Sequence, residues 1–153
     1  MPEVLKGHLD GRGLRIAIAA ARFNAYITER LLDSAVARLA ELGVADSDIR
    51  VAWVPGSFEL PFAAARLAAD ERVDAVICLG AVIEGETAHF EYVARSAAEG
   101  IARVGAEARV PVIFGVLTAY TTDQAFARVG HGAGYAEAAV EMATLGRSLD
   151  DAG

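Results

Sequence analysis

The run from Asp74 to Ile83 is apolar at almost every position. It lacks the alternation of polar and apolar residues that is typical of a strand with one solvent-exposed face. Strands of this kind are typical of parallel sheets, because helices cover both faces of such a sheet. Three further runs of strand length, at 14–20, 49–53 and 110–117, are rich in apolar residues. Because parallel strands need crossover connections, the sequence predicts a helix between each strand and the next.

Helical periodicity fills the segments between these runs. Apolar residues recur from Ile27 to Leu42 at the spacing of one helix face, and Gly43 is expected to end that helix. Thr121 and Gln124 have the spacing of a capping box, which predicts a short helix ending near Arg128. The other expected helices span 61–69, about 88–107 and about 135–149. This alternation predicts a flavodoxin-like three-layer α/β/α sandwich with a four-stranded parallel sheet, in a single domain over residues 1–153.

Composition and charge narrow the class of protein. With 14 basic and 21 acidic residues and no cluster of lysine or arginine, the net charge of −7 disfavours nucleic-acid binding. The apolar runs are too short to span a bilayer, and residues 1–13 lack the apolar core of a signal peptide, so no membrane association is expected. The single cysteine, Cys78, is expected to be a buried and inert thiol, which fits a reducing cytoplasm. A hydrophobic content of 54% suits burial of surface against copies of the same chain.

A turn with hydrogen-bonding and ionisable groups follows the most apolar strand. Gly85, Glu86 and Thr87 stand between that strand and the next helix, and His89 comes just after them. Backbone N–H groups at the beginning of a helix lack partners within the helix, and they bind anions such as phosphate. A histidine transfers protons near neutral pH. Ligands bind beyond the carboxyl ends of parallel strands, so this turn predicts a phosphate-handling site at that edge.

This strand and turn form one of five separated motifs. Residues 79–90 read LGAVIEGETAHF, and the other four are Arg22-Phe23-Asn24, residues 54–61 (VPGSFELP), residues 114–118 (FGVLT) and Arg128. In this order and spacing, over roughly residues 10 to 149, they resemble the lumazine synthase family. Members of that family catalyse the penultimate step of riboflavin synthesis.

The resemblance implies a reaction and a set of site residues. The chain would condense 5-amino-6-ribitylaminouracil with 3,4-dihydroxy-2-butanone 4-phosphate to 6,7-dimethyl-8-ribityllumazine. No cofactor is implied, and the sequence carries no metal-ligand spacing, GxGxxG or P-loop. His89 would transfer protons and Phe23 would stack on the pyrimidine. The other implied substrate contacts are Gly56, Ser57, Glu59, the backbone of Ala81, Val82 and Ile83, and Phe114, with the phosphate at Gly85, Glu86, Thr87 and Arg128.

The resemblance also implies an assembly. In the family five subunits form a ring, so a homo-oligomer built from pentamers is expected. Phe114 is expected to reach into a neighbouring subunit's site. The segment before Leu14 is expected to add a strand to a neighbour's sheet.

The residues alone leave simpler roles open. Ser57 and Glu59 suit the start of a helix, because a hydroxyl and a carboxylate there are stabilised by free N–H groups. Phe58 beside them is expected in the core. Phe23 fits core packing as well as stacking, and His89 fits a solvated first turn of a helix.

One departure from the family pattern follows Arg128. Many members carry a Gly-Thr-Lys-Ala-Gly-Asn-Lys-Gly turn there, whose lysines add positive charge near the phosphate. Here residues 130–135 read Gly-His-Gly-Ala-Gly-Tyr, a shorter turn without lysine, where His131 is the only ionisable group that could replace that charge. By itself, Arg128 suits a helix C-terminus. An archaeal-type riboflavin synthase and a non-catalytic flavin-binding or shell-forming homologue therefore stay as alternative functions.

Overall fold

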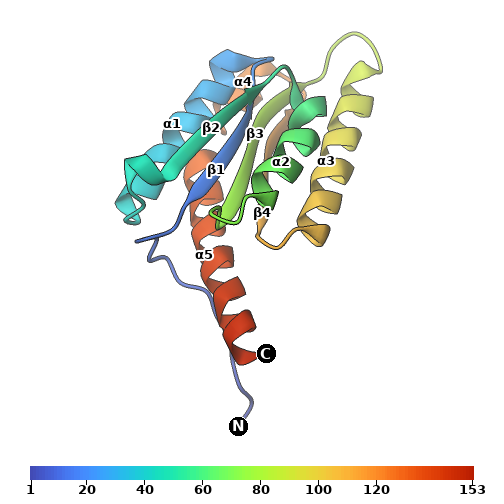
Figure 1. Cartoon of the computed structure of the whole chain (residues 1–153). Helices are drawn as coiled ribbons and strands as arrows, with labels where there is room; N and C mark the ends of the chain where they lie inside the picture. Colours follow the sequence, from blue (N-terminus) through green and yellow to red (C-terminus); the bar gives the residue numbers. More distant parts are fainter.

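Four segments form one parallel sheet in the computed structural model, which describes residues 1–153 (Figure 1). The strands lie in the order β2 (Ile49–Val54), β1 (Ile16–Ala21), β3 (Ala75–Ile83) and β4 (Val112–Ala119). All of β1 is buried, and so is all of β3 except its last residue, because helices cover both faces of the sheet. The expected four-stranded parallel sheet is therefore confirmed.

Helices form the two outer layers (Figure 1). One face of the sheet packs against α1 (Ala25–Glu41) and α5 (His131–Ala152), and the other against α2 (Leu60–Ala69) and α3 (His89–Glu107). Each face has its own apolar core, so the chain is the expected three-layer α/β/α sandwich. None of the helices combines the length and apolar character that crossing a bilayer requires. The short elements are η1 (Asp46–Asp48), η2 (Ser57–Glu59) and α4 (Thr122–Phe126).

Helix ends follow the sequence signals closely. Gly43 follows Leu42, the C-cap of α1, and has a φ of 99°, as expected of a glycine that terminates a helix. Thr121 caps α4, because its hydroxyl accepts a hydrogen bond of 3.1 Å from the Gln124 N–H. The reciprocal bond differs from the expected capping box: the Gln124 side chain accepts from the N–H of Tyr120, one residue before the cap.

The start of α5 contradicts the sequence prediction. Residues 130–135 are expected to form a turn, but the helix already begins at His131. A side chain from α1 stabilises this early start. The Ser34 hydroxyl donates to the Gly130 carbonyl (3.2 Å) and accepts from the Ala133 N–H (3.0 Å). The cap is thus supplied by another helix, which a local pattern does not reveal.

Gly132 allows α5 to approach α1 closely. A Cβ at this position would lie 2.2 Å from the Leu31 carbonyl oxygen, so only glycine fits without moving the helices apart. Further along the pair, the Arg38 guanidinium of α1 bonds the Glu137 carboxylate of α5 at 3.0 Å. Of the three glycines in residues 130–134, Gly132 therefore serves helix packing rather than a turn.

The segment before β1 lies alongside α5 without forming a strand (Figure 1). The His8 N–H donates to the Thr144 hydroxyl (2.9 Å), and that hydroxyl donates to the His8 carbonyl (3.2 Å). Val4, Leu5 and Leu9 nevertheless remain exposed. The addition of this segment to a neighbour's sheet stays a prediction.

Candidate active site

A pocket of about 700 Å³ lies where β1, β2 and β3 end. Strand ends, three turns and the first turns of α3 contribute to it, as expected for an open parallel sheet. The lining residues are Phe23, Asn24, Pro55, Gly56, Ser57, Phe58, Glu59, Ala81, Val82, Ile83, Gly85, Thr87, His89, Phe90 and Val93. Three of the five sequence motifs, far apart along the chain, thus meet at one cavity.

The turn after β1 presents an aromatic ring to this cavity. The N–H groups of Arg22 and Phe23 donate to the carbonyls of Val54 and Pro55, at 2.8 and 2.9 Å, which ties the turn to the end of β2. Phe23 is 72% exposed although it follows a fully buried strand. Packing of this ring in the core of the chain is therefore excluded, and its face is free to stack on a planar ligand.

The turn after β2 brings a hydroxyl and a carboxylate to the cavity. Ser57 is buried, and its Oγ lies only 2.6 Å from the position that a Cβ on Gly80 would take, so Gly80 in β3 makes room for this hydroxyl. The Glu59 carboxylate folds back toward Gly56, with Oε1 3.4 Å from the corresponding position there. Both polar groups fit the recognition of a hydroxylated chain.

Phe58 corrects the sequence prediction. It is expected in the core, but it is 60% exposed and lines the cavity. The reason is the tight turn of η2, in which Ser57 and Leu60 take the buried positions on either side. The middle residues of such a turn point outward, and the apolar character of Phe58 alone does not indicate this.

The end of β3 offers backbone groups. β1 pairs with β3 only as far as Leu79, and beyond that point the Asn24 side-chain amide donates to the Ala81 carbonyl at 2.9 Å. The backbone N–H and C=O groups of successive residues in a strand point to opposite neighbours, so those of Val82 point toward β4. Those of Ile83 point to the β1 side of the strand, where β1 no longer pairs with β3. Of the three residues expected to read a ring edge, Ile83 therefore has the freest peptide groups.

The turn between β3 and α3 carries the remaining polar groups. Gly85 and Thr87 line the cavity, and the Thr87 hydroxyl accepts a bond of 3.4 Å from the His89 N–H. Glu86 is exposed and does not line the cavity. The turn precedes the helix, whose first residue is His89, so the helix begins within about one residue of the predicted start near residue 88.

Phe114 and Arg128 lie outside this cavity. Phe114 is 43% exposed on the edge strand β4. The Arg128 guanidinium is exposed and donates to the Gln124 carbonyl at 2.8 Å. No lysine or arginine lines the cavity, and its only ionisable side chains are Glu59 and His89. The cavity therefore offers an anion no lysine or arginine from this chain.

Five residues that line the cavity were not among the predicted site residues: Asn24, Pro55, Phe58, Phe90 and Val93. Phe90 and Val93 lie one helical turn apart on α3, and their spacing alone predicts only a helix face. Asn24 lies within one of the matching motifs, but the sequence predicts no role for it. Cys78 behaves as predicted, because burial raises the pKa of its thiol to about 12.

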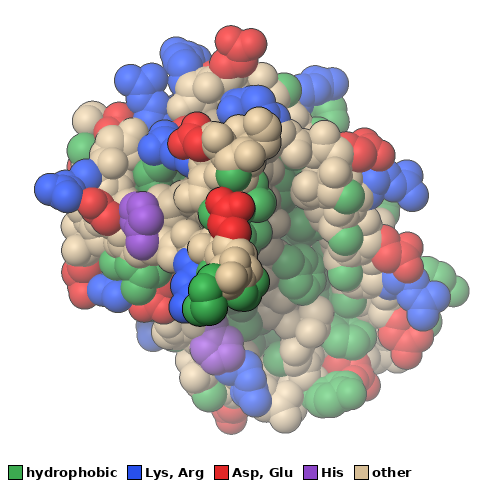
Figure 2. Space-filling model, turned by 90° about the horizontal axis from the view of Figure 1, so that it is seen from below, with side chains coloured by type: hydrophobic (Ala, Val, Ile, Leu, Met, Phe, Trp, Pro, Cys, Tyr) green, Lys and Arg blue, Asp and Glu red, His purple; other side chains and the backbone are tan.

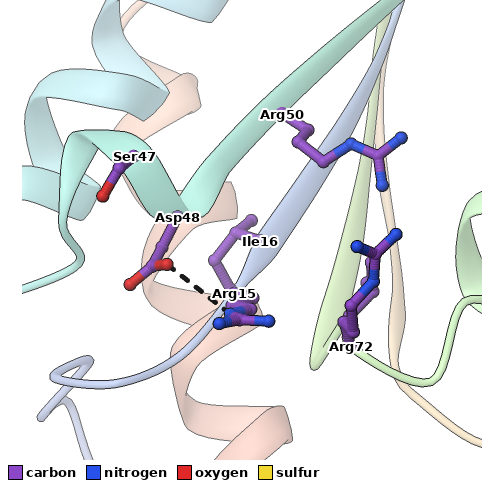
Figure 3. A pocket seen from close by; sticks show the side chains of 7 residues that line it. Arg15, Ile16, Ser47, Asp48, Arg50 and Arg72 are labelled. Atoms are coloured by element: carbon purple, nitrogen blue, oxygen red, sulfur yellow. Dashed lines mark ion pairs between the residues drawn. The ribbon is translucent and has the colours of Figure 1, made fainter.

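A smaller hollow of about 220 Å³ lies at the opposite ends of the strands (Figure 3). It contains three arginines, but each is paired. Arg15 lies 3.6 Å from Asp48, and both Arg50 and Arg72 bond Asp70, at 3.0 and 2.9 Å. Hydrogen bonds from Arg72 hold the pKa of Asp70 well below its ordinary range. In Figure 2, basic and acidic side chains are interspersed over this end of the molecule. Because each of the three arginines is paired with a carboxylate of the same chain, they stabilise the fold.

Comparison with known families agrees with this geometry. Residues 13–147 match the family described as 6,7-dimethyl-8-ribityllumazine synthase. The match begins just before β1 and ends within α5, so it includes every strand and every residue that lines the larger cavity. The chain therefore belongs to the 6,7-dimethyl-8-ribityllumazine synthase family, transferase-type enzymes of riboflavin biosynthesis.

Proposed function

We propose that this chain is a cytoplasmic lumazine synthase acting as a single domain. It condenses 5-amino-6-ribitylaminouracil with 3,4-dihydroxy-2-butanone 4-phosphate, giving 6,7-dimethyl-8-ribityllumazine, phosphate and two molecules of water. The observation that carries the proposal is the meeting of three separate family motifs at one cavity at the strand ends. Family membership supports the same reaction.

The pyrimidine and its ribityl chain occupy the part of the cavity between β1 and β3. The exposed ring of Phe23 stacks on the pyrimidine, which contributes roughly 0.5–1.5 kcal/mol beyond area burial. The free peptide groups of Ile83 bind the ring edge, and Ala81 and Val82 beside it line the same part of the cavity. The hydroxyl of Ser57 and the carboxylate of Glu59 bind the ribityl hydroxyls.

The phosphate binds at the turn before α3. Backbone N–H groups around Gly85, Glu86 and Thr87 donate to its oxygens, together with the free N–H groups at the start of the helix. Because the cavity lacks a cation of its own, we assign the compensating charge to Arg128 of a neighbouring subunit. A guanidinium binds phosphate through two parallel hydrogen bonds, which suits this role.

His89 performs the proton transfers. The ring amine attacks the ketone and water leaves, which forms an imine. Removal of a proton from the hydroxyl-bearing carbon next to the imine expels phosphate from the following carbon. The enol that results tautomerises to a new ketone. The ribitylamino nitrogen then attacks this ketone and a second water leaves. No net oxidation or reduction occurs, so positioning and proton transfer suffice without a cofactor.

An assay with the two purified substrates tests this function. Formation of the lumazine, at a rate that a chelator leaves unchanged, is the expected result. Conversion of added lumazine to riboflavin would instead indicate the archaeal-type riboflavin synthase reaction. A chain that binds flavin but forms neither product would be the non-catalytic homologue, and the proposed function would be wrong.

The site is completed by a second copy of the chain, which we infer to be the next subunit of a five-membered ring. Phe114 and Arg128 enter from that neighbour, since neither lines the cavity of its own chain. Each copy then makes the same heterologous contact with the next.

Mixing two inactive variants tests the shared site. One variant carries a severe change at Phe23 and the other at Arg128, and they are refolded together. Random mixing leaves both halves intact at roughly one interface in four, so activity is expected to rise well above that of either variant alone. If subunits demonstrably mix and no activity returns, each site is built by one chain.

A further inference from the structure

Asn24 adopts a backbone conformation that few side chains tolerate. Its φ of 62° and ψ of 38° lie in the left-handed region, and it is the only residue other than glycine with a positive φ. It is also the only asparagine of the chain. Residues in this conformation cluster at active sites and ligand-binding sites, where the surrounding structure stabilises them. Asn24 lies between the exposed Phe23 and the start of α1, and it lines the cavity.

The Asn24 side chain continues the sheet at the point where β1 leaves it. β1 turns away toward the end of β2, so the carbonyl of Ala81 loses the strand that would have bonded it. The Asn24 Nδ2 donates to this carbonyl at 2.9 Å and takes the place of the missing strand. Because the peptide groups of β3 alternate in direction, those of Ile83 are the next to point to the β1 side of the strand, and Ile83 lines the cavity.

We propose that Asn24 is a positioning residue that sets where along β3 a planar heterocycle is bound. Because the Asn24 amide occupies the Ala81 carbonyl, the free donor and acceptor for the ring edge are the N–H and C=O of Ile83. The left-handed turn also sets the position of the neighbouring Phe23. The ring of Phe23 and the end of β3 form the two walls of the binding slot, the part of the cavity that holds the heterocycle. This proposal rests on the proposed function, because its ligand is the ribitylaminopyrimidine.

Loss of the amide bond is expected to weaken binding of that one substrate. The freed Ala81 carbonyl would compete for the ring or hold a water in the slot, while the phosphate turn at Gly85 to Thr87 belongs to another segment. The effect of Asn24 should therefore fall on the pyrimidine and not on the phosphorylated ketone.

Two substitutions separate the amide bond from the backbone conformation. Asn24→Gly keeps the left-handed turn without strain and removes the side chain. Asn24→Asp keeps the size and also tolerates the turn, but an ionised carboxylate cannot donate to a carbonyl. Tyr26→Phe is the matched control, because its hydroxyl is 3.5 Å from the Asn24 Oδ1 and contributes little to holding the amide.

The measurements are the Kd of the ribitylaminopyrimidine, the KM of each substrate and the melting temperature, on the assembled protein. Both Asn24 variants are expected to raise the Kd and KM of the pyrimidine about tenfold, a typical effect of one lost hydrogen bond. The KM of the phosphorylated ketone and the melting temperature of Asn24→Gly should stay close to those of the unchanged protein, and Tyr26→Phe should match it throughout.

Two results would overturn the inference. One is unchanged pyrimidine affinity in both variants. The other is a parallel loss for both substrates that follows the melting temperature, which would mean a purely structural role. An unchanged protein that binds no ribitylaminopyrimidine would instead refute the proposed function, and with it the ligand of this slot.

Discussion

Replacing Gly132 by alanine is expected to destabilise the fold, whereas the same change at Gly134 is expected to stabilise it. Both glycines lie in the first turn of α5, two residues apart. A Cβ on Gly132 would meet backbone atoms of α1, at 2.2 Å from the Leu31 carbonyl oxygen and 2.9 Å from the Ala35 nitrogen. A Cβ on Gly134 would meet nothing within 4 Å.

The distances from the added Cβ give the size of the change in the free energy of unfolding. To restore ordinary contacts of about 3.5 Å, α5 must move away from α1 by roughly 1 Å, and helix backbone cannot swing aside as a side chain can. Overpacking of this kind costs about 1–3 kcal/mol, and here the upper half applies. Alanine returns roughly 0.5 kcal/mol of helix propensity, so the net loss for Gly132→Ala is about 2 kcal/mol. Gly134→Ala keeps only the gain, about 0.5–1 kcal/mol.

Urea unfolding at one fixed protein concentration measures both changes, since oligomerisation makes apparent stability depend on concentration. In a chain of this length, 1 kcal/mol corresponds to about 2–4 °C in melting temperature. Gly132→Ala should therefore melt roughly 4–8 °C lower, and Gly134→Ala slightly higher, than the unchanged protein. Equal stability of the two variants would refute the close helix contact and favour the turn that the sequence predicts.

Three further changes test the site and the core. His89→Ala should lower turnover about tenfold with nearly unchanged pyrimidine binding, because the chemistry depends partly on proximity; turnover equal to the unchanged protein would remove the proton-transfer role. Arg128→Ala should raise the KM of the phosphorylated ketone more than Arg128→Lys, which keeps the charge and loses the bidentate fork; an unchanged KM would exclude a phosphate contact. Burial raises the pKa of Cys78 from 9.0 to about 12, so the neutral thiol contributes stability below pH 9 that is lost as the pH rises toward 12. A thiol reagent near pH 8 should modify this cysteine only after denaturation, and rapid reaction of the folded chain would contradict its burial.

The sequence by itself determined the layers and the place of the site. Uniform apolar character over residues 75–83 requires cover on both faces of a strand, and alternating helical stripes supply that cover. Parallel strands then bring their carboxyl ends to one edge, whatever the details of packing. Phe23, Ser57 and His89, each just beyond a strand end, therefore meet at one cavity.

Only the tertiary structure decided features whose partners are distant in the chain. The early start of α5 depends on Ser34, which is 99 residues before the N–H that it accepts from. The bond from Asn24 spans 57 residues to Ala81, and only the divergence of β1 from β3 makes it possible. Phe114 and Arg128 lie outside the cavity because β4 and α4 stand beyond its edge, although their motifs fall in the same order as the others. Local periodicity specifies which face of an element is buried, but the residue against which that face packs is set by the assembled fold.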